Sequence, residues 1–221
     1  MKRFFGTSEL PEIELSEKSL LDLAKSSLDV GKTVTGVQKK LSLNLSVDNK
    51  PRLTIVDYYA GYILKPQTPE YPFLPELEFI TMKMAERAHI KTVPSALIPT
   101  SGNEFAYITK RIDRTPDADT GTVQKYAMED FCQLGKRMTE DKYNGSYERC
   151  AKIIAFYSSQ EALDLTEFFM RLVFCYIVGY SDMHLKNFSL AEFPYLFGDH
   201  QALPKTPEKT EMVLCFPLGF A

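Results

Sequence analysis

The segment from Asp182 to Asn187 combines residue types and a spacing that suit phosphoryl transfer. That reaction needs bound phosphates, negative charge neutralised by a divalent cation, and an acceptor hydroxyl held against a carboxylate. Asp182 could accept the hydroxyl proton, and Asn187 could bind Mg²⁺. Between them, Lys186 could place positive charge on the transferred group, and His184 could brace the loop. The alternative is that residues 181–184 only cap a helix end.

Two upstream features favour the same chemistry, and a third segment is weak by itself. Lys65 closes an apolar stretch, where protein kinases carry the strand lysine that pairs with nucleotide phosphates. Glu78 follows near the start of the next helix and is a natural ion-pair partner for it. The alternative is a solvated lysine at a strand end, which is the usual state of lysine. Residues 33–40 could cover phosphates, although they are neither a Walker motif nor a GxGxxG loop, and a simple loop would explain them too.

The elements that must position these residues change class along the chain. A helix is expected after Ser16, and the two-residue apolar alternation that follows predicts strands. The expected strands cover 41–46, 53–56, 61–65, 95–98 and 105–112, with a helix at 76–89. Its residues Leu77, Ile80, Met84 and Ala88 fall on one face.

After residue 113, helices are expected at 128–136, 147–157 and 166–180. The last is apolar nearly all round, which predicts a buried central helix. The pattern favours an α+β, bilobal, kinase-like fold. A β-rich N-terminal lobe would cover 1–112 and a helical C-terminal lobe 113–221.

Composition narrows the function classes. The chain has 221 residues, 44% of them hydrophobic, and a net charge of −3, so nothing indicates direct nucleic-acid binding. Its four cysteines form no CxxC pair, which argues against zinc. The N-terminus turns polar too early for a signal peptide, and the most apolar stretch, 168–178, contains Arg171 and is too short for a bilayer. A cytoplasmic protein without membrane association is expected.

Taken together, these segments resemble the HipA-like serine/threonine kinases of bacterial toxin–antitoxin systems. The likeness covers most of the chain and is most specific at the catalytic loop, residues 181–189. Ile112 stands where the family usually has an aromatic residue. The other similar segments are the phosphate loop at 35–42, the lysine strand at 62–66, the first-lobe helix at 74–78, the hinge at 108–114 and the helix start at 128–133.

The resemblance implies ATP and Mg²⁺ as cofactors and a role for each matching residue. Asp182 would be the general base and Asn187 a Mg²⁺ ligand. Nucleotide contacts would come from Gly36, Val37, Gln38, Lys40, Lys65 with its partner Glu78, Lys110 and Ile112. The family autophosphorylates in its phosphate loop, where this chain has Thr33 and Thr35. The usual second metal motif is missing, and Asp199 is the candidate to replace it.

The short N-terminal region is similar to the HipT toxins of tripartite HipBST systems. That likeness implies a small HipS-like antitoxin, a DNA-binding HipB-like protein, and an aminoacyl-tRNA synthetase, the tryptophanyl enzyme in HipT-type members, as substrate. The C-terminal lobe is expected to be incomplete after Leu190, so a pseudokinase that binds nucleotide or antitoxin is one alternative. A small-molecule phosphotransferase is another, although no acidic substrate cluster stands out.

Overall fold

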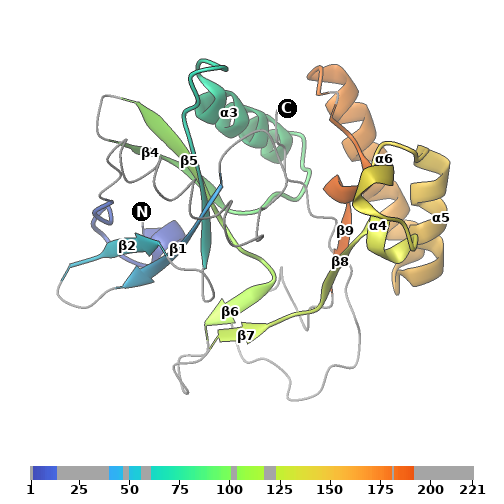
Figure 1. Ribbon diagram of the computed structural model, residues 1–221, viewed down its shortest axis with the longest axis horizontal. Coiled ribbons are helices and arrows are strands. Elements are labelled where there is room, and N and C mark those ends of the chain that lie inside the picture. The colour runs from blue at the N-terminus through green and yellow to red at the C-terminus, as the bar shows by residue number, and fades with distance from the viewer. Residues whose placement is uncertain are drawn as a thin grey trace.

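The structure is a computed structural model that describes residues 2–13, 40–46, 50–55, 61–100, 104–116, 123–180 and 182–191. In these ranges an antiparallel sheet is followed by a mainly helical region (Figure 1). Some predicted features lie outside the described residues. They are the helix after Ser16, the phosphate-loop residues Thr33, Thr35, Gly36, Val37 and Gln38, and the metal candidate Asp199.

The β-rich half contains one five-stranded sheet with the order β2-β1-β3-β5-β4. Its strands are β1 (Leu41–Ser46), β2 (Arg52–Ile55), β3 (Tyr62–Pro66), β4 (Ser95–Pro99) and β5 (Phe105–Lys110). Every neighbouring pair is antiparallel. These strands confirm the expectation from the two-residue alternation, because Leu41 and Leu43 are buried while Asn44 is exposed.

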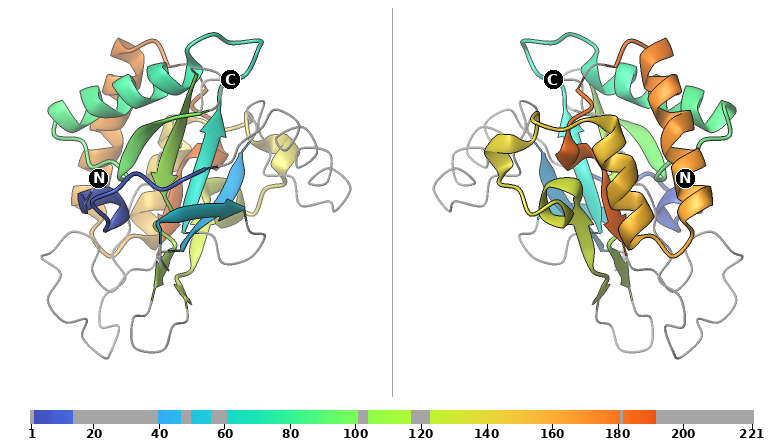
Figure 2. Two further views of the ribbon diagram at one scale, coloured as in Figure 1. Left: turned by 90° about the vertical axis from the view of Figure 1, so that its left-hand side faces the viewer. Right: turned by 90° about the vertical axis from the view of Figure 1, so that its right-hand side faces the viewer.

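The two faces of this sheet are covered by different elements. One face carries an apolar cluster that includes Leu43, Leu64 and Ile108 and packs against α1 (Lys2–Phe5). The other face is covered over β4 and β5 by helix α3 (Leu74–Arg87), as the views in Figure 2 show. Side chains of β3 alternate between the two faces, so neighbouring residues on that strand meet different surroundings.

Helix α3 buries a different face from the one that the sequence predicted. Leu77, Ile80 and Met84 are exposed. The residues buried instead are Leu74, Pro75, Glu78, Thr81, Met82 and Ala85. The apolar periodicity was misleading because the buried face includes polar residues. Glu78 has a charged partner there, and the Thr81 hydroxyl donates to the Leu77 carbonyl at 2.8 Å.

The second half is built from short strands and helices. In chain order they are β6 (Arg114–Pro116), β7 (Val123–Lys125), β8 (Met128–Asp130), α4 (Phe131–Leu134), the 3₁₀ turn η1 (Thr139–Asp141), α5 (Tyr147–Tyr157), α6 (Glu161–Ile177), the 3₁₀ turn η2 (Leu185–Asn187) and β9 (Ser189–Ala191). Phe131, Phe168 and Phe188 meet at the centre of its core.

The predicted helix at 128–136 is wrong at both ends. Residues 128–130 form β8, which pairs with β9, a strand some sixty positions later. Helix α4 covers only 131–134 and begins with a capping box, in which Asp130 accepts from the Gln133 amide and Gln133 accepts from the Asp130 amide. The cap was present in the sequence, but the strand partner exists only in the folded chain.

Helix α6 also differs from expectation. It covers 161–177 rather than 166–180, and it is not buried all round. Phe168 is 3% exposed, whereas the adjacent Phe169 is 64% exposed and Tyr176 is 88% exposed. The opposite conditions of the two phenylalanines show that one face of α6 packs on the core and another faces outward.

Contacts between α3, the sheet and α6 join the two halves. Met82 and Tyr107 from the first half pack with Cys175 and Tyr180 from the second. The buried Arg171 of α6 adds a polar link, because its guanidinium donates to the Lys91 carbonyl at 3.0 Å. No helix in the described part of the chain is long and apolar enough to cross a membrane.

Candidate active site

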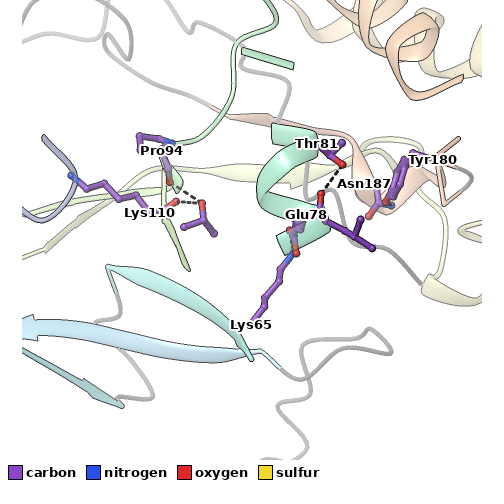
Figure 3. Close-up of polar contacts among 9 residues, drawn as sticks. Lys65, Glu78, Thr81, Pro94, Lys110, Tyr180 and Asn187 are labelled. Atoms are coloured by element: carbon purple, nitrogen blue, oxygen red, sulfur yellow. Dashed lines mark hydrogen bonds and ion pairs between the residues drawn. The ribbon is translucent and has the colours of Figure 1, made fainter. Parts of the chain in front are cut away.

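Lys65 and Glu78 form an ion pair between β3 and α3. Leu64 packs in the apolar cluster on the α1 side, so the next residue, Lys65, points to the opposite face, under the helix. Figure 3 shows its side chain reaching Glu78, which stands on the buried face of α3. Lys65 is 3% exposed and Glu78 is 1% exposed. The ion pair expected from the sequence is thus present and withdrawn from water.

The electrostatics of this pair depend on a second lysine. Burial raises the pKa of Glu78, and the charges of Lys65 and Lys40 act against that rise. One carboxylate oxygen, Oε1, contacts Lys65. The other, Oε2, is buried without a hydrogen bond in the described part of the protein. A carboxylate in this position depends on nearby positive charge to remain ionised.

Lys40 contributes further positive charge to the surroundings of Glu78. It directly precedes β1, on the same side of the strand as Ser42, and it is half-buried. Burial and the charge of Lys65 lower the pKa of Lys40, while Glu78 and Asp182 oppose the change.

Side-chain contacts link the sheet to the segment after α6 through tyrosines. The Lys65 ammonium lies 5.5 Å from the Tyr107 ring centre, and Tyr107 packs with Tyr180. The Tyr180 hydroxyl in turn accepts a hydrogen bond from Asn187.

The segment after α6 positions Asp182 through Asn187. Gly179, with a φ of 71°, ends the helix in the left-handed region, and the chain then turns back toward the core. The Asn187 amide nitrogen donates to the Asp182 carbonyl and to the Tyr180 hydroxyl, the latter at 3.3 Å. Figure 3 shows Asn187 and Tyr180 beside α3. The five-residue spacing thus closes a tight loop in which the two predicted residues meet.

The Asp182 carboxylate has two neighbours that the sequence analysis did not name together. The Tyr143 hydroxyl donates to Oδ1 at 3.2 Å, and His184 Nε2 lies 3.7 Å from Oδ2. The His184 ring also packs edge-on against Tyr143, with 5.1 Å between ring centres. Burial lowers the pKa of His184, although the Asp182 charge opposes the shift. A neutral imidazole suits the bracing role that the sequence predicted.

Lys186 forms an ion pair with Asp130. Its ammonium lies 2.6 Å from an oxygen of Asp130, the residue that caps α4. The sequence analysis placed this charge on the transferred phosphoryl group. In the structure the charge instead ties the catalytic loop to the α4 N-terminus, and the predicted phosphate contact stays a prediction.

The predicted hinge follows β5. The Lys110 amide donates to the Pro94 carbonyl at 3.1 Å, and the Lys110 ammonium lies 5.8 Å from the Phe4 ring centre, on the α1 side of the sheet. Burial lowers the pKa of Lys110. Ile112 is half-buried, and next to it Asp113 accepts two hydrogen bonds from Arg111 at 2.7 and 2.9 Å. The predicted contact of residues 110–112 with the adenine edge stays a prediction.

The described residues supply one predicted metal ligand. Both hydrogen bonds of Asn187 use its amide nitrogen, so neither engages the amide oxygen, the atom that a hard cation such as Mg²⁺ prefers. Within the described ranges, no group of three or more histidine, cysteine, aspartate or glutamate side chains could hold a metal ion. Asn187 therefore has an amide oxygen that could bind Mg²⁺, and its role as a metal ligand stays a prediction.

Comparison with known proteins identifies the family of this chain. The model of the HipA-like C-terminal domain family matches residues 33–203, which is more than half of the chain. The chain belongs to this family. Two relatives are each named "Putative kinase". One, from Haemophilus influenzae, is 29% identical over 199 residues, and the other, Y4mE from Sinorhizobium fredii, is 30% identical over 162 residues.

This chain matches only part of each of these longer relatives. The two alignments cover 87% and 72% of this chain but 56% and 38% of the relatives. Among solved structures, HipA of Shewanella oneidensis, in a complex with HipB and operator DNA, is similar with a TM-score of 0.64 at 19% identity. That likeness covers 96% of this chain and 52% of the other, and it shows a shared mixed α/β fold.

Proposed function

We propose that this chain is the catalytic core of a HipA-like serine/threonine protein kinase toxin, with a β-rich lobe at 1–112 and a helical lobe at 113–221. The observation that carries the proposal is the set of contacts that joins Lys65 to the segment from Asp182 to Asn187. The Lys65 ammonium lies 5.5 Å from the Tyr107 ring centre, Tyr107 packs with Tyr180, and the Tyr180 hydroxyl accepts from Asn187. These contacts support a site in which a phosphate-binding lysine and a candidate base act together, as phosphoryl transfer requires.

In the proposed reaction, a protein hydroxyl bound beside Asp182 attacks the γ-phosphorus of ATP. The bond from that phosphorus to the bridging oxygen breaks, ADP leaves, and the hydroxyl proton passes to Asp182. Lys65, held by Glu78, and Lys40 would neutralise phosphate charge. Mg²⁺, when bound, would supply Lewis-acid charge neutralisation at the phosphates.

Other residues complete the proposed site. The backbone of Lys110 and Ile112 would hold the adenine edge, and His184 would brace the loop. Asn187 and Asp199 would hold Mg²⁺, while Gly36, Val37 and Gln38 would cover the phosphates. Thr33 and Thr35 are the proposed autophosphorylation sites, because they stand in the segment that resembles the family's phosphate loop, where its members autophosphorylate.

The biological setting is proposed from the family. The Shewanella relative is a toxin–antitoxin HipA in a complex with HipB and operator DNA, which supports a HipB-like partner for this chain. We further propose a HipS-like antitoxin of the HipBST kind, a cytoplasmic location, and an aminoacyl-tRNA synthetase, possibly of the tryptophanyl type, as the substrate.

Radiolabelled ATP with Mg²⁺ tests the proposal directly. We expect the wild-type chain to label itself, and Asp182→Asn to lower labelling about 10²- to 10⁴-fold while nucleotide binding by calorimetry is retained. Tyr157→Phe, which removes a hydroxyl that donates to the Leu134 carbonyl elsewhere in the same half, is the matched control. Nucleotide binding without any transfer would replace this proposal with the pseudokinase alternative.

Substrate choice needs a separate assay. Purified tryptophanyl-tRNA synthetase and a second synthetase would be incubated with the wild-type chain and with Asp182→Asn, and the products examined by intact mass. We expect a mass increase of one phosphate on the tryptophanyl enzyme with the wild type alone. Transfer to both synthetases or to neither would remove the tryptophanyl assignment but leave the kinase proposal intact.

A further inference from the structure

A turn that the sequence analysis did not single out contacts the catalytic loop. We define residues 139–145, from η1 to Gly145, as the clamp turn. We infer that Tyr143 of this turn is a positioning residue that orients the Asp182 carboxylate. The inference rests on the proposed function for its kinetic consequence, but the contact itself can be tested without any kinase activity.

The contact between Tyr143 and Asp182 leaves the carboxylate free to work. The Tyr143 hydroxyl donates to Oδ1 at 3.2 Å, from a position 39 residues earlier in the chain. A carboxylate offers about four lone-pair sites, so one donor at Oδ1 does not block an acceptor hydroxyl at Oδ2. What the bond does remove is free rotation of the carboxylate about its side-chain axis. The reactive oxygen is thereby kept in one orientation.

The clamp turn is itself held against the catalytic loop by its backbone. The Leu185 amide donates to the Lys142 carbonyl at 3.0 Å. This bond joins the residue before Tyr143 to the catalytic loop, beyond Asp182. Gly145 packs so closely on Leu185 that a Cβ there would lie 2.7 Å from a side-chain carbon. Such contact admits only glycine without a shift of the neighbour. The distance between the backbone of the clamp turn and the catalytic loop is therefore set by contacts other than the bond of the Tyr143 hydroxyl.

Further bonds fix the shape of the turn. The Asn144 amide donates to the Asp141 carbonyl at 2.9 Å, and its side-chain amide donates to the Asp141 carboxylate at 3.1 Å. Arg137 donates to the Asn144 carbonyl. The residues that these bonds join flank Tyr143 in the sequence, and Tyr143 itself is 63% exposed. An exposed tyrosine on a rigid turn is placed by the backbone rather than by burial.

Ring and hydroxyl have separable contacts. The Tyr143 ring meets the edge of His184, and the Lys142 ammonium lies 4.8 Å from its centre. Only the hydroxyl contacts Asp182. Tyr143→Phe should keep the ring contacts and lose the orienting bond, which makes it a clean substitution for this inference.

The kinetic test compares Tyr143→Phe with Tyr157→Phe. For Tyr143→Phe we expect kcat to fall about 10-fold while KM for ATP stays within about twofold, because misorientation of the base affects the transfer step and not nucleotide binding. Tyr157→Phe, which also removes one exposed tyrosine hydroxyl bond, should match the wild type. An unchanged kcat for Tyr143→Phe, or an equal fall for both variants, would overturn the inference.

A thermal double-mutant cycle tests the contact even if the wild type shows no kinase activity. Tyr143→Phe and Asp182→Ala would be combined, and the melting temperatures of all four proteins compared without nucleotide. We expect Tyr143→Phe to lower Tm by about 2 °C in the wild type and by clearly less in the Asp182→Ala background. Equal shifts in both backgrounds would show that the two side chains do not interact. Failure of the proposed function would show instead as an inactive wild type with an intact cycle.

Discussion

The two ion pairs of the candidate site differ in how far they are withdrawn from water. In the β-rich half, the Lys65 and Glu78 side chains are 4% and 2% exposed, whereas in the helical half Lys186 and Asp130 are 24% and 14% exposed. A fully buried ion left without its partner carries a large desolvation penalty, and a partly exposed one is rescued by water. In the β-rich half, the residues proposed to bind phosphate are thus also expected to stabilise the fold, and in the helical half the two roles can be separated.

The largest expected effect comes from breaking the buried pair. Lys65→Met should abolish phosphoryl transfer and destabilise the fold by about 3–5 kcal/mol, because Glu78 would be left buried without its main partner. Urea unfolding and the labelling assay measure the two effects side by side.

The matched control is the double variant Lys65→Met/Glu78→Gln. Removing both charges should restore most of the lost stability but none of the activity. If the double variant is as unstable as the single one, the destabilisation comes from packing rather than from an unpaired carboxylate, and the contrast between the two halves loses its basis.

A second test lies within the helical half. Phe168 packs against Phe188, with 5.1 Å between ring centres, and its neighbour Phe169 is largely exposed. Phe168→Ala should lower the free energy of unfolding by about 3–5 kcal/mol. Phe169→Ala should change it by less than about 0.5 kcal/mol. Similar losses for both substitutions would mean that the outer face of α6 is covered in solution.

The smallest expected effect belongs to the partly exposed pair. Lys186→Met and Asp130→Asn should each lower the free energy of unfolding by about 0.5–1 kcal/mol, and both should lower transfer by the same small factor. Equal effects fit a pair that only anchors the catalytic loop. A loss of transfer in Lys186→Met that greatly exceeds the loss in Asp130→Asn would instead place Lys186 on the phosphoryl group, as the sequence suggested.

Strands were easier to predict than helix faces in this protein. The alternation through Leu41 and Leu43 needs only one buried side of a sheet, and the strands formed where it indicated. Helix α3 also formed, but its packed face was misassigned because Glu78 is buried there while Ile80 is exposed. Apolar periodicity assumes that the buried face of a helix is its hydrophobic face. A buried ion pair places a charged residue on the packed face, so the pattern then indicates the wrong face.

The site was predictable where its residues lie close in sequence or in the expected order of elements. Asp182 and Asn187 form one short loop, and Lys65 is separated from Glu78 by a single connection between strand and helix. No pattern in the sequence indicated that Tyr143 or Asp130 would contact the catalytic loop. They reach the catalytic loop from 39 and 56 positions away, through turns whose geometry depends on the packed core.

The sequence by itself determined the strands of the five-stranded sheet, the presence of helix α3, the order of the charged residues and the spacing from Asp182 to Asn187, because each depends on local periodicity or on neighbours along the chain. Only the tertiary structure decided which face of α3 and α6 is buried, that β8 pairs with β9, and that Lys186 turns to Asp130. These outcomes depend on partners distant in sequence. The free energy of burying a side chain is set by what packs against it, and a linear pattern does not contain that information.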